Sequence, residues 1–314
     1  MVIRLRRIRA RLGDIPFIQM LSLAILAGCP GHLSSEQKIW EQFSGEKALA
    51  HVQSLVDLGP RPPRSQALEK SRGYIEKQLA QWGWQITRQS FTDDTPRGKI
   101  EFVNLIARFR KGQSDAKPVP LFLLCSHYDT KLFDDFRFVG ANDGGSSTGL
   151  LIETARVLAQ QPALAAKIEL VFFDGEEAFE TFSGRDGLYG SRHFAAELEK
   201  ENTVGQFRGG ILFDMVGDRS LNITLPPDSP SSMARDIFAA AEALKYREHF
   251  TYFDRGITDD HTPLNAIGIP TIDLIDFDFP WWHTADDTMD KLSAESLETV
   301  GKVAIYYLSE LGLK

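Results

Sequence analysis

Cysteine is scarce in this sequence, with only Cys29 and Cys125 among its 314 residues. A framework of disulfide bonds within one domain is therefore excluded, and the stability of the fold must come from a hydrophobic core. Cys125 ends an uninterrupted apolar run that begins at Leu121. We expect its thiol to be buried as a small apolar group rather than to act as a nucleophile.

Linkers and internal repeats are also lacking. No stretch rich in Gly and Ser, in Pro or in charge divides the chain, and no unit of about 20–50 residues recurs. The composition, with 43% hydrophobic and 25% charged residues, is that of an ordinary globular protein that can bury a full core. We therefore expect one large domain.

The amino-terminal segment lacks the length of a membrane-spanning helix. Its first eleven residues hold five arginines, and the uncharged stretch that follows, 15–28, has 14 residues where a stable span needs about 20. This pattern predicts an export signal. The stretch ends in Leu26-Ala27-Gly28-Cys29, which resembles the lipobox of bacterial lipoproteins. We therefore predict a lipoprotein-type signal peptide over residues 1–28 and a mature domain over residues 29–314.

The lipobox resemblance implies that Cys29 is lipidated and attaches the mature chain to a membrane. The protein would then be exported to the cell envelope and face the periplasm or the exterior. The alternative is a plain cleaved signal, or a short anchor, in which Cys29 has no role, because small residues precede the cleavage site of all export signals.

Excess positive charge is absent from the predicted mature domain. Removing residues 1–28 takes away five of the 35 basic and one of the 43 acidic side chains, which leaves a net charge of −12. Binding to nucleic acid requires a basic face for the phosphates. We therefore expect no nucleic-acid partner.

Several predicted elements precede the first buried strand. Apolar residues recur at helical spacing over 35–58 and 65–79, and the Gly-Pro-rich segment 59–63 separates these two predicted helices. Residues 84–91 and 102–109 alternate like half-buried strands, and the polar segment 93–98 between them is typical of a turn. We expect a hairpin at the edge of a sheet.

After residue 118, short apolar runs alternate with amphipathic helical patterns. The predicted strands are 119–126, 168–173, 209–214 and 269–275, and the predicted helices are 147–160, 189–202, 230–245 and 292–311. This alternation predicts an α/β fold: a single-domain, mostly parallel mixed sheet flanked by helices on both faces. In such folds ligands bind in the crevice at the carboxyl ends of the strands.

Polar residues that can bind a metal ion or transfer a proton follow these strands. They are Ser126-His127-Tyr128-Asp129, Asn142-Asp143-Gly144-Gly145, Asp174-Gly175-Glu176-Glu177, Asp214, and Trp282-His283-Thr284. Taken singly, each has an ordinary structural explanation, such as a hydrogen-bonded surface histidine, a helix cap or a solvated acidic pair. Together they would repel one another unless a cation held them.

The ligand types point to zinc. Carboxylate and imidazole groups suit this ion, and a catalytic zinc site typically keeps three protein ligands and one open position. The neighbouring glutamates Glu176 and Glu177 can divide the work: one binds the metal, and the other remains free as a general base.

At these residues the sequence resembles the zinc aminopeptidase and glutaminyl cyclase superfamily, and the animal-type glutaminyl cyclases more closely than the aminopeptidases. The similar segments run in order from about residue 40 to the end of the chain. They are 126–131, 139–143, 172–179, 188–193, 259–263 and 282–284. The most specific are the Phe-Phe-Asp-Gly-Glu-Glu-Ala-Phe run over 172–179 and the Asp-Asp-His run that begins at Asp259.

The resemblance implies an α/β/α sandwich of the zinc-aminopeptidase type and assigns roles to single residues. One Zn²⁺ would be held by Asp143, Glu177 and His283. Glu176 would be the proton shuttle. Asp214 and Asp259 would form a hydrogen-bonded acidic pair that shares one proton and helps to hold the substrate.

The pocket for the substrate departs from the animal pattern at two positions. Trp282 would line the pocket as in the family. Phe182 stands where the animal enzymes carry a tryptophan, and Thr258 stands where they carry a glutamine. Phe182 keeps an aromatic wall without the indole N–H, and Thr258 loses an amide that touches substrate. Trp281 is expected to form a further wall.

The reaction implied by the resemblance converts the amino-terminal glutamine of peptide or protein substrates to pyroglutamate, with release of ammonia. The alternative is a two-zinc aminopeptidase, in which His127 and Asp214 complete a second metal site and Glu176 activates water. A third possibility is a non-catalytic surface domain that binds peptides. Asp259, which resembles the extra acid of the cyclases, favours the cyclase. The sequence does not specify an oligomeric state.

Two residues near the predicted site are expected to be structural. Asp287 either orients the imidazole of His283 or caps the turn before the last helix. His261 is expected to hold a loop rather than to bind zinc.

Overall fold

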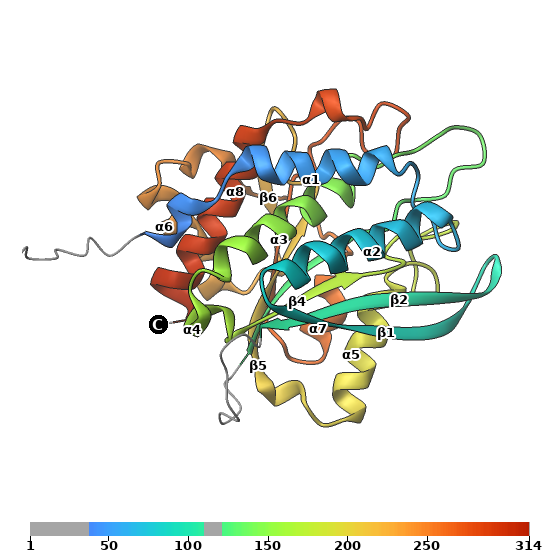
Figure 1. Ribbon diagram of the computed structural model, residues 1–314, viewed down its shortest axis with the longest axis horizontal. Helices are drawn as coiled ribbons and strands as arrows, with labels where there is room; N and C mark the ends of the chain where they lie inside the picture. The colour runs from blue at the N-terminus through green and yellow to red at the C-terminus, as the bar shows by residue number, and fades with distance from the viewer. Residues whose placement is uncertain (1–37, 110–120, 314) are drawn as a thin grey trace, which may run out of the picture. The chain divides into compact units, whose positions relative to one another are not determined.

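A six-stranded sheet forms the centre of the computed structural model, which describes residues 38–109 and 121–313. The strand order is β1-β2-β4-β3-β5-β8 (Figure 1). The strands are β1 (Trp84–Thr95), β2 (Gly98–Phe109), β3 (Leu121–His127), β4 (Ile168–Phe173), β5 (Phe207–Asp214) and β8 (Thr271–Ile275). The β4, β3, β5 and β8 neighbours pair in parallel, whereas β1, β2 and β4 pair antiparallel. The predicted mostly parallel mixed sheet is therefore confirmed.

Helices connect and cover these strands. The α-helices are α1 (Gly45–Asp57), α2 (Gln66–Gln81), α3 (Gly145–Leu158), α4 (Pro162–Ala165), α5 (Tyr189–Lys200), α6 (Ser231–Ala243), α7 (His261–Ala266) and α8 (Ala294–Tyr306). Short 3-10 segments lie at Ile39–Gln42, Val204–Gln206, Arg247–His249 and Met289–Lys291. A π-helical segment, Tyr307–Gly312, follows α8 directly.

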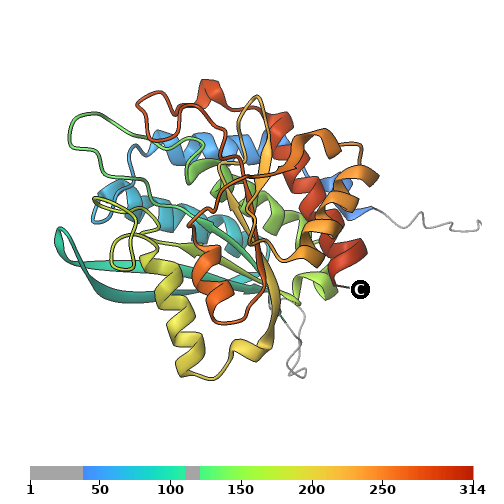
Figure 2. The same ribbon diagram turned by 180° about the vertical axis from the view of Figure 1, so that it is seen from behind.

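The strands present alternate side chains to two helical layers, as a pleated sheet requires. Phe122 and Leu124 of β3 belong to the larger core beneath α1, α3 and α8. Leu123 and Cys125 face the other way and pack with Phe194 of α5. Figure 2 shows α5 and α7 on the face opposite α1 and α3. The predicted helices on both faces and the predicted burial of Cys125 are therefore confirmed.

The predicted hairpin is present and is longer than expected. Its strands continue to Thr95 and resume at Gly98, and Thr95 pairs with Gly98 across the turn. Thr95 Oγ1 donates a hydrogen bond to the carbonyl of Gly98, which helps to close this turn. Polar residues at 93–94 suggested a turn, but strand pairing includes them.

The prediction of one continuous helix over 35–58 is wrong for the described residues, which form two separate helical segments. A 3-10 turn (Ile39–Gln42) comes first, and Ser44 then adopts an extended backbone and caps α1 by accepting a hydrogen bond from the N–H of Lys47. Phe43, buried between the two, anchors the break in the core. The apolar periodicity continues through the break, which hid it from sequence reasoning.

The sequence also missed a second, two-stranded sheet. Strands β6 (Ile223–Leu225) and β7 (Phe250–Tyr252) pair in parallel. Three-residue strands carry too little alternation to be recognised.

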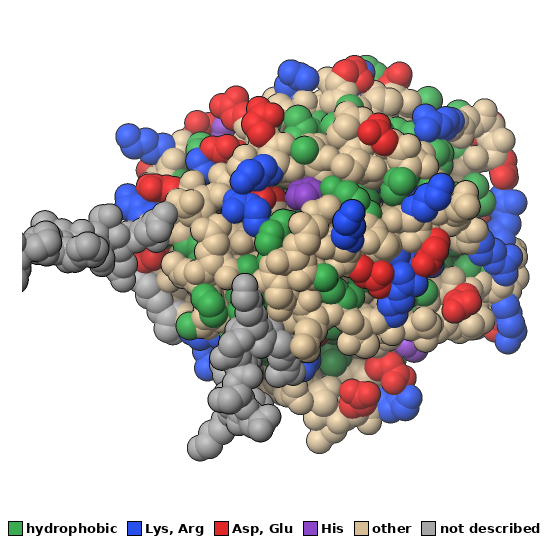
Figure 3. Space-filling model, viewed as in Figure 1, with side chains coloured by type: hydrophobic (Ala, Val, Ile, Leu, Met, Phe, Trp, Pro, Cys, Tyr) green, Lys and Arg blue, Asp and Glu red, His purple; other side chains and the backbone are tan. Residues whose placement is uncertain are grey.

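Acidic and basic side chains are interspersed over the face of the molecule shown in Figure 3.

The predicted signal peptide (1–28) and Cys29 lie outside the described residues. Among the residues that are described, the helices are too short or too polar to cross a membrane.

Candidate active site

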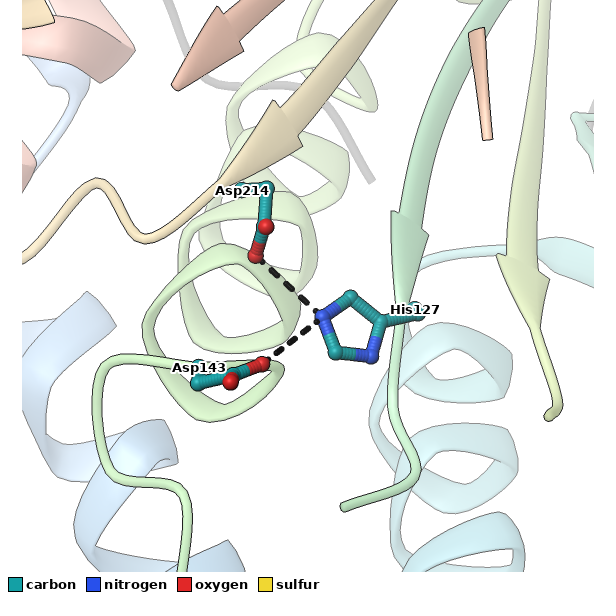
Figure 4. A group of neighbouring side chains, drawn as sticks. All are labelled: His127, Asp143 and Asp214. Carbon is teal, nitrogen blue, oxygen red and sulfur yellow. Dashed lines mark hydrogen bonds and ion pairs between the residues drawn. The ribbon is translucent and has the colours of Figure 1, made fainter. Parts of the chain in front are cut away.

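Three side chains converge where the parallel strands end. His127 is the last residue of β3, Asp214 is the last residue of β5, and Asp143 lies two residues before α3. The His127 Nε2 atom is 3.3 Å from Asp143 Oδ1 and 3.2 Å from Asp214 Oδ1. Figure 4 shows the imidazole of His127 pointing between the two carboxylates. These are the residues that the two-zinc alternative requires.

Asp143 also belongs to a second group, with Glu177 and His283. The His283 Nε2 atom lies 3.4 Å from Asp143 Oδ2 and 3.3 Å from Glu177 Oε2. The ligand atoms in each group lie within 4.8 Å of one another. The structure therefore brings together the three predicted zinc ligands, and Asp143 turns one oxygen toward each group.

The donor set of the second group fits a divalent cation. His283 Nε2 is within 3.3–3.4 Å of three carboxylate oxygens, but an imidazole nitrogen can donate only one hydrogen bond. Asp143 Oδ2 and Glu177 Oε2 are buried without a hydrogen-bond partner. Buried charged oxygens of this kind are costly unless an ion coordinates them. Two carboxylates and one imidazole are also the ligand types of catalytic zinc sites.

The pKa values of the site residues also show that positive charge is favoured there. Burial opposes ionisation of Asp143, but His127 and His283 together hold the pKa of its carboxyl below its usual range. Burial tends to lower the pKa of His283, yet Glu177 and Asp143 raise it to about 10. The buried carboxylates of the site therefore favour positive charge beside them.

Asp143 is fixed by its backbone. The carboxylate of Asp287 accepts hydrogen bonds from the N–H of Asn142 (2.7 Å) and from the N–H of Asp143 (3.1 Å). Gly144 follows with φ +71°, and a Cβ there would lie 2.6 Å from the carbonyl of Asp129. Asp287 therefore orients Asp143, whereas the sequence suggested either His283 or the last helix as its partner.

Arg61 holds the loop that leads to Asp143, although sequence reasoning treated its Gly-Pro-rich segment only as a break between helices. The side chain is fully buried. It donates hydrogen bonds to the carbonyls of Tyr128 (3.1 Å), Val139 (2.8 Å) and Gly140 (3.0 Å). A buried guanidinium that satisfies three backbone carbonyls fixes the loop firmly.

The two neighbouring glutamates are directed differently. Asp129 accepts hydrogen bonds from the N–H of Glu176 (3.1 Å) and of Glu177 (3.4 Å), which fixes the turn after β4. Glu177 faces His283, whereas Glu176 belongs to neither cation group. Burial raises the pKa of Glu176 well above its usual range; His127 opposes this shift, and Glu177 adds to it. A carboxyl whose pKa is raised by burial holds a proton more tightly than an exposed one, which suits a group that accepts and returns a proton.

A cavity of about 200 Å³ opens beside these groups. Phe182, Thr258 and Trp282, the three residues predicted to bind substrate, all line it. The side chains of Ile257 and Phe277 line it as well, and sequence reasoning missed both. Neither residue belongs to a motif that would have identified it from the sequence.

The prediction for Trp281 as a pocket wall is wrong. It does not line the cavity, and its ring lies under the Lys291 ammonium at 4.8 Å. Adjacent residues in this turn point in different directions, so Trp282 faces the cavity and Trp281 does not.

Asp214 and Asp259 both line the cavity, but the predicted hydrogen bond between them is not formed. Asp214 Oδ1 instead faces His127, and Asp259 Oδ2 has no hydrogen-bond partner among the described residues. Burial raises the pKa of Asp259 to about 6, and the nearby charge of Asp214 adds to the shift. The two carboxyl groups therefore influence each other through space.

A further buried polar cluster lies behind Asp259. His261 Nε2 is 3.3 Å from Asp228 Oδ2, and His261 Nδ1 is 3.4 Å from Asp273 Oδ2. These contacts tie the start of α7 to β8 and to the segment before α6. They are compatible with a role for His261 in holding a loop, but His261, Asp259 and Asp273 also form a third group whose ligand atoms lie within 4.8 Å of one another, so the expectation that His261 does not bind a metal stays a prediction.

The family of the chain follows from comparison with known proteins. A model described as "Peptidase family M28" matches residues 104–308, more than half of the chain. The chain therefore belongs to peptidase family M28. The matched region contains all the residues of both cation groups.

Named relatives narrow the resemblance within that family. A glutaminyl-peptide cyclotransferase of Dictyostelium discoideum is 31% identical to this chain, and the match covers 82% of the chain and 81% of the relative. The glutaminyl-peptide cyclotransferase of Bos taurus is 30% identical, with 82% and 79% covered. Both matches extend over most of each protein.

Solved structures agree on the fold. An Acidobacteriales bacterium glutaminyl cyclase has a TM-score of 0.76 at 33% identity, and the match covers 85% of this chain and 94% of that one. A Zn-dependent exopeptidase from Parabacteroides distasonis is also similar, with a TM-score of 0.77 at 27% identity and 86% and 99% covered. The zinc-aminopeptidase-type sandwich predicted from the sequence is confirmed.

Proposed function

We propose that this chain is a zinc-dependent glutaminyl-peptide cyclotransferase. It would convert the amino-terminal glutamine of peptides to pyroglutamate and release ammonia. The observation that carries the proposal over the aminopeptidase is the position of Asp259, which lines the same small cavity as Glu176 and the Asp143, Glu177 and His283 group. The curated relatives that cover four-fifths of the chain are named for this reaction.

Asp143, Glu177 and His283 would hold the zinc ion. When bound, zinc supplies electrophilic stabilisation of the negative charge that develops on the γ-carbonyl oxygen of the substrate glutamine. Asp287 and Arg61 keep the Asp143 loop in place through the backbone contacts described above. A site held in advance loses little free energy to reorganisation.

Glu176 would move the proton. The α-amine of the substrate attacks its own γ-carboxamide carbon, so a carbon–nitrogen bond forms and closes a five-membered lactam. Glu176 accepts a proton from the attacking nitrogen and returns it to the departing nitrogen as the original carbon–nitrogen bond breaks, which gives ammonia. Because amine and carboxamide belong to one residue, the cavity has only to hold them in contact.

The walls of the cavity would orient the substrate. Asp259 Oδ2, which has no hydrogen-bond partner among the described residues, can accept a hydrogen bond from the substrate amine. Thr258 offers a hydroxyl in the same wall. Phe182 and Trp282 exclude water, which would otherwise compete with the amine.

The second candidate function is the two-zinc aminopeptidase. It is supported by the group of His127, Asp143 and Asp214, which is geometrically able to hold another ion. In that enzyme Glu176 would activate water. A non-catalytic peptide-binding domain would not need Glu176 in this position.

One experiment separates the candidates. Zinc-loaded protein is incubated with a Gln-peptide and with a Leu-peptide, and zinc is counted by elemental analysis on the same sample. The cyclotransferase gives ammonia and a pyroglutamyl peptide from the first and no free leucine from the second, with one zinc per chain. Free leucine with two zinc ions would identify the aminopeptidase. Absence of product from both peptides would support the non-catalytic peptide-binding domain.

We further propose that residues 1–28 direct export and that lipidated Cys29 tethers the enzyme to a membrane of the cell envelope. The support is the arginine-rich start, the short apolar stretch and the Leu-Ala-Gly-Cys ending. Expression with an alkyne fatty acid should label the wild-type chain and leave Cys29→Ala unlabelled. Equal labelling of the two chains would refute lipidation at Cys29.

A further inference from the structure

A row of four aromatic rings runs from the cation group to the molecular surface. The ring of His283 stacks on Trp282 with centroids 4.2 Å apart. Trp282 is 5.1 Å from Phe277, and Phe277 is 5.5 Å from Phe253. The proposed reaction uses the inner end of this row and leaves the outer end, at Phe253, without a role.

The row extends beyond the cavity. Trp282 and Phe277 line the cavity, whereas Phe253 does not. Phe253 and Phe277 are only partly buried, and both pack on a buried apolar cluster that includes Met215 and Ile257. The two rings therefore rest on a firm base and remain partly exposed to solvent.

The geometry of a peptide limits where the side chain of its second residue can lie. A substrate held by its amino-terminal residue has its second Cα about 3.8 Å from the first, because trans peptide geometry fixes that distance. Successive side chains of an extended peptide point to opposite sides. The second side chain thus emerges within about one residue length of the innermost rings of the row.

We propose that Phe277 and Phe253 form a subsite for the side chain of the second residue of the substrate, and that this subsite favours aromatic and large aliphatic side chains. The inference rests on the proposed function and adds a preference for the second residue to it. The Arg255 guanidinium lies 5.3 Å from the centroid of the Phe253 ring, a cation–π contact at this outer ring.

The expected preference is modest. An aromatic contact at a partly exposed site contributes about as much as a tenfold change in an equilibrium constant. We therefore expect kcat/KM for a Gln-Phe peptide to exceed that for a Gln-Gly peptide about tenfold. The amino-terminal glutamine is the same in both, so the ratio isolates the second side chain.

The test compares two substitutions of neighbouring aromatic residues on zinc-loaded enzyme. Phe253→Ala should lower the Gln-Phe to Gln-Gly ratio of kcat/KM from about ten to about two. Tyr252→Ala is the matched control, because Tyr252 is 56% exposed and its ring packs on Phe238 instead of on the row. This control should leave both rates unchanged. Phe253→Leu, which keeps an apolar side chain, should restore part of the ratio.

The outcomes distinguish this inference from the proposed function. Cyclisation of both peptides with equal kcat/KM in the wild type, or an equal effect of Phe253→Ala and Tyr252→Ala on the ratio, would refute the subsite and leave the cyclotransferase intact. Absence of pyroglutamyl product from every Gln-peptide would refute the cyclotransferase itself. Melting temperatures of the variants identify any that fail to fold, and Phe253→Leu then carries the test.

Discussion

Asp287 holds the backbone of Asp143 from a position 144 residues further along the chain. Its two carboxylate oxygens accept hydrogen bonds from two successive N–H groups, those of Asn142 and Asp143. Asp287 also lies four residues after His283. One short segment therefore supplies a candidate zinc ligand and also the group that orients a second one.

Asp287→Asn should weaken zinc binding. An asparagine keeps one acceptor oxygen and turns an NH₂ group toward a backbone N–H, so the Asp143 loop loses a hydrogen bond and gains a repulsive contact. Groups that orient metal ligands are typically worth about 10- to 100-fold in metal affinity. Competition with a fluorescent chelator measures the dissociation constant. Asp286→Asn, at the exposed neighbouring residue, is the control, and an equal affinity in both variants would contradict the role of Asp287.

Glu176→Gln should abolish most turnover while the chain keeps its metal. Glutamine has the shape of the glutamate but cannot accept and return a proton, and proton transfer of this kind contributes about 10²- to 10⁴-fold to rate. Steady-state ammonia release and elemental analysis are measured on the same preparation. Glu180→Gln changes an exposed glutamate nearby and should leave both readings unchanged. Loss of zinc from Glu176→Gln would instead make Glu176 a ligand.

Removal of the metal should destabilise the fold. Without a cation, the buried oxygens of Asp143 and Glu177 lose their coordination, and an ion bound at about 100 times its dissociation constant stabilises the native state by about 2.7 kcal/mol. A chelator should therefore lower the melting temperature by roughly 5–10 °C, and added zinc should restore it. Glu177→Gln should shrink this shift. A melting temperature that changes with neither chelator nor zinc would argue against the proposed zinc site.

Arg61→Lys should reduce stability and metal affinity together. A lysine keeps the charge but cannot reach three carbonyls in the planar arrangement of the guanidinium. Hydrogen bonds to buried charged groups contribute about 1.5–3 kcal/mol each, so we expect a loss of about 3 kcal/mol in the free energy of unfolding. Urea titration measures it. Arg64→Lys, in the same loop but solvent-exposed, should change stability by less than about 0.5 kcal/mol.

Asp276 should make stability depend on pH. Burial raises the pKa of its carboxyl to about 7, so the folded state favours the protonated form. The resulting stabilisation is complete below the usual pKa of an aspartate and is lost as the pH rises toward 7. The free energy of unfolding of Asp276→Asn should fall less between pH 4 and pH 8 than that of the wild type, by a difference on the order of 3 kcal/mol. Chelator is kept present throughout, and Asp254→Asn is the exposed control.

Much of the fold could be predicted because its central strands, β3, β4, β5 and β8, are almost entirely buried. β4 is predicted at the residues where it occurs, 168–173, since a short run that is apolar except for Glu169 and is bounded by Lys167 and Asp174 is hard to mistake. The break at Ser44 and the strands β6 and β7 could not be found, because a single capping residue or three residues of strand leave too short a pattern.

Some residues of the candidate site could likewise be predicted from the sequence, and others could not. His127 ends a strand, and Asp143, Glu177 and His283 lie in loops that follow strands, where topology brings distant residues together; the structure places them within reach of one another. Arg61, Asp287 and Phe277 act through backbone carbonyls, backbone N–H groups and ring packing. No residue pattern encodes such contacts, so only the folded chain reveals them.

Cys125 is the free cysteine of the described residues and lies in the core between the sheet and α5. Burial also raises the pKa of its thiol well above the usual value, so the reactive thiolate is suppressed as long as the core stays closed. A thiol reagent can modify this sulfur only after the α5 layer separates from the strands. The rate at which Cys125 is labelled therefore reports how often that layer opens transiently. Mass spectrometry can measure this rate without any engineered probe.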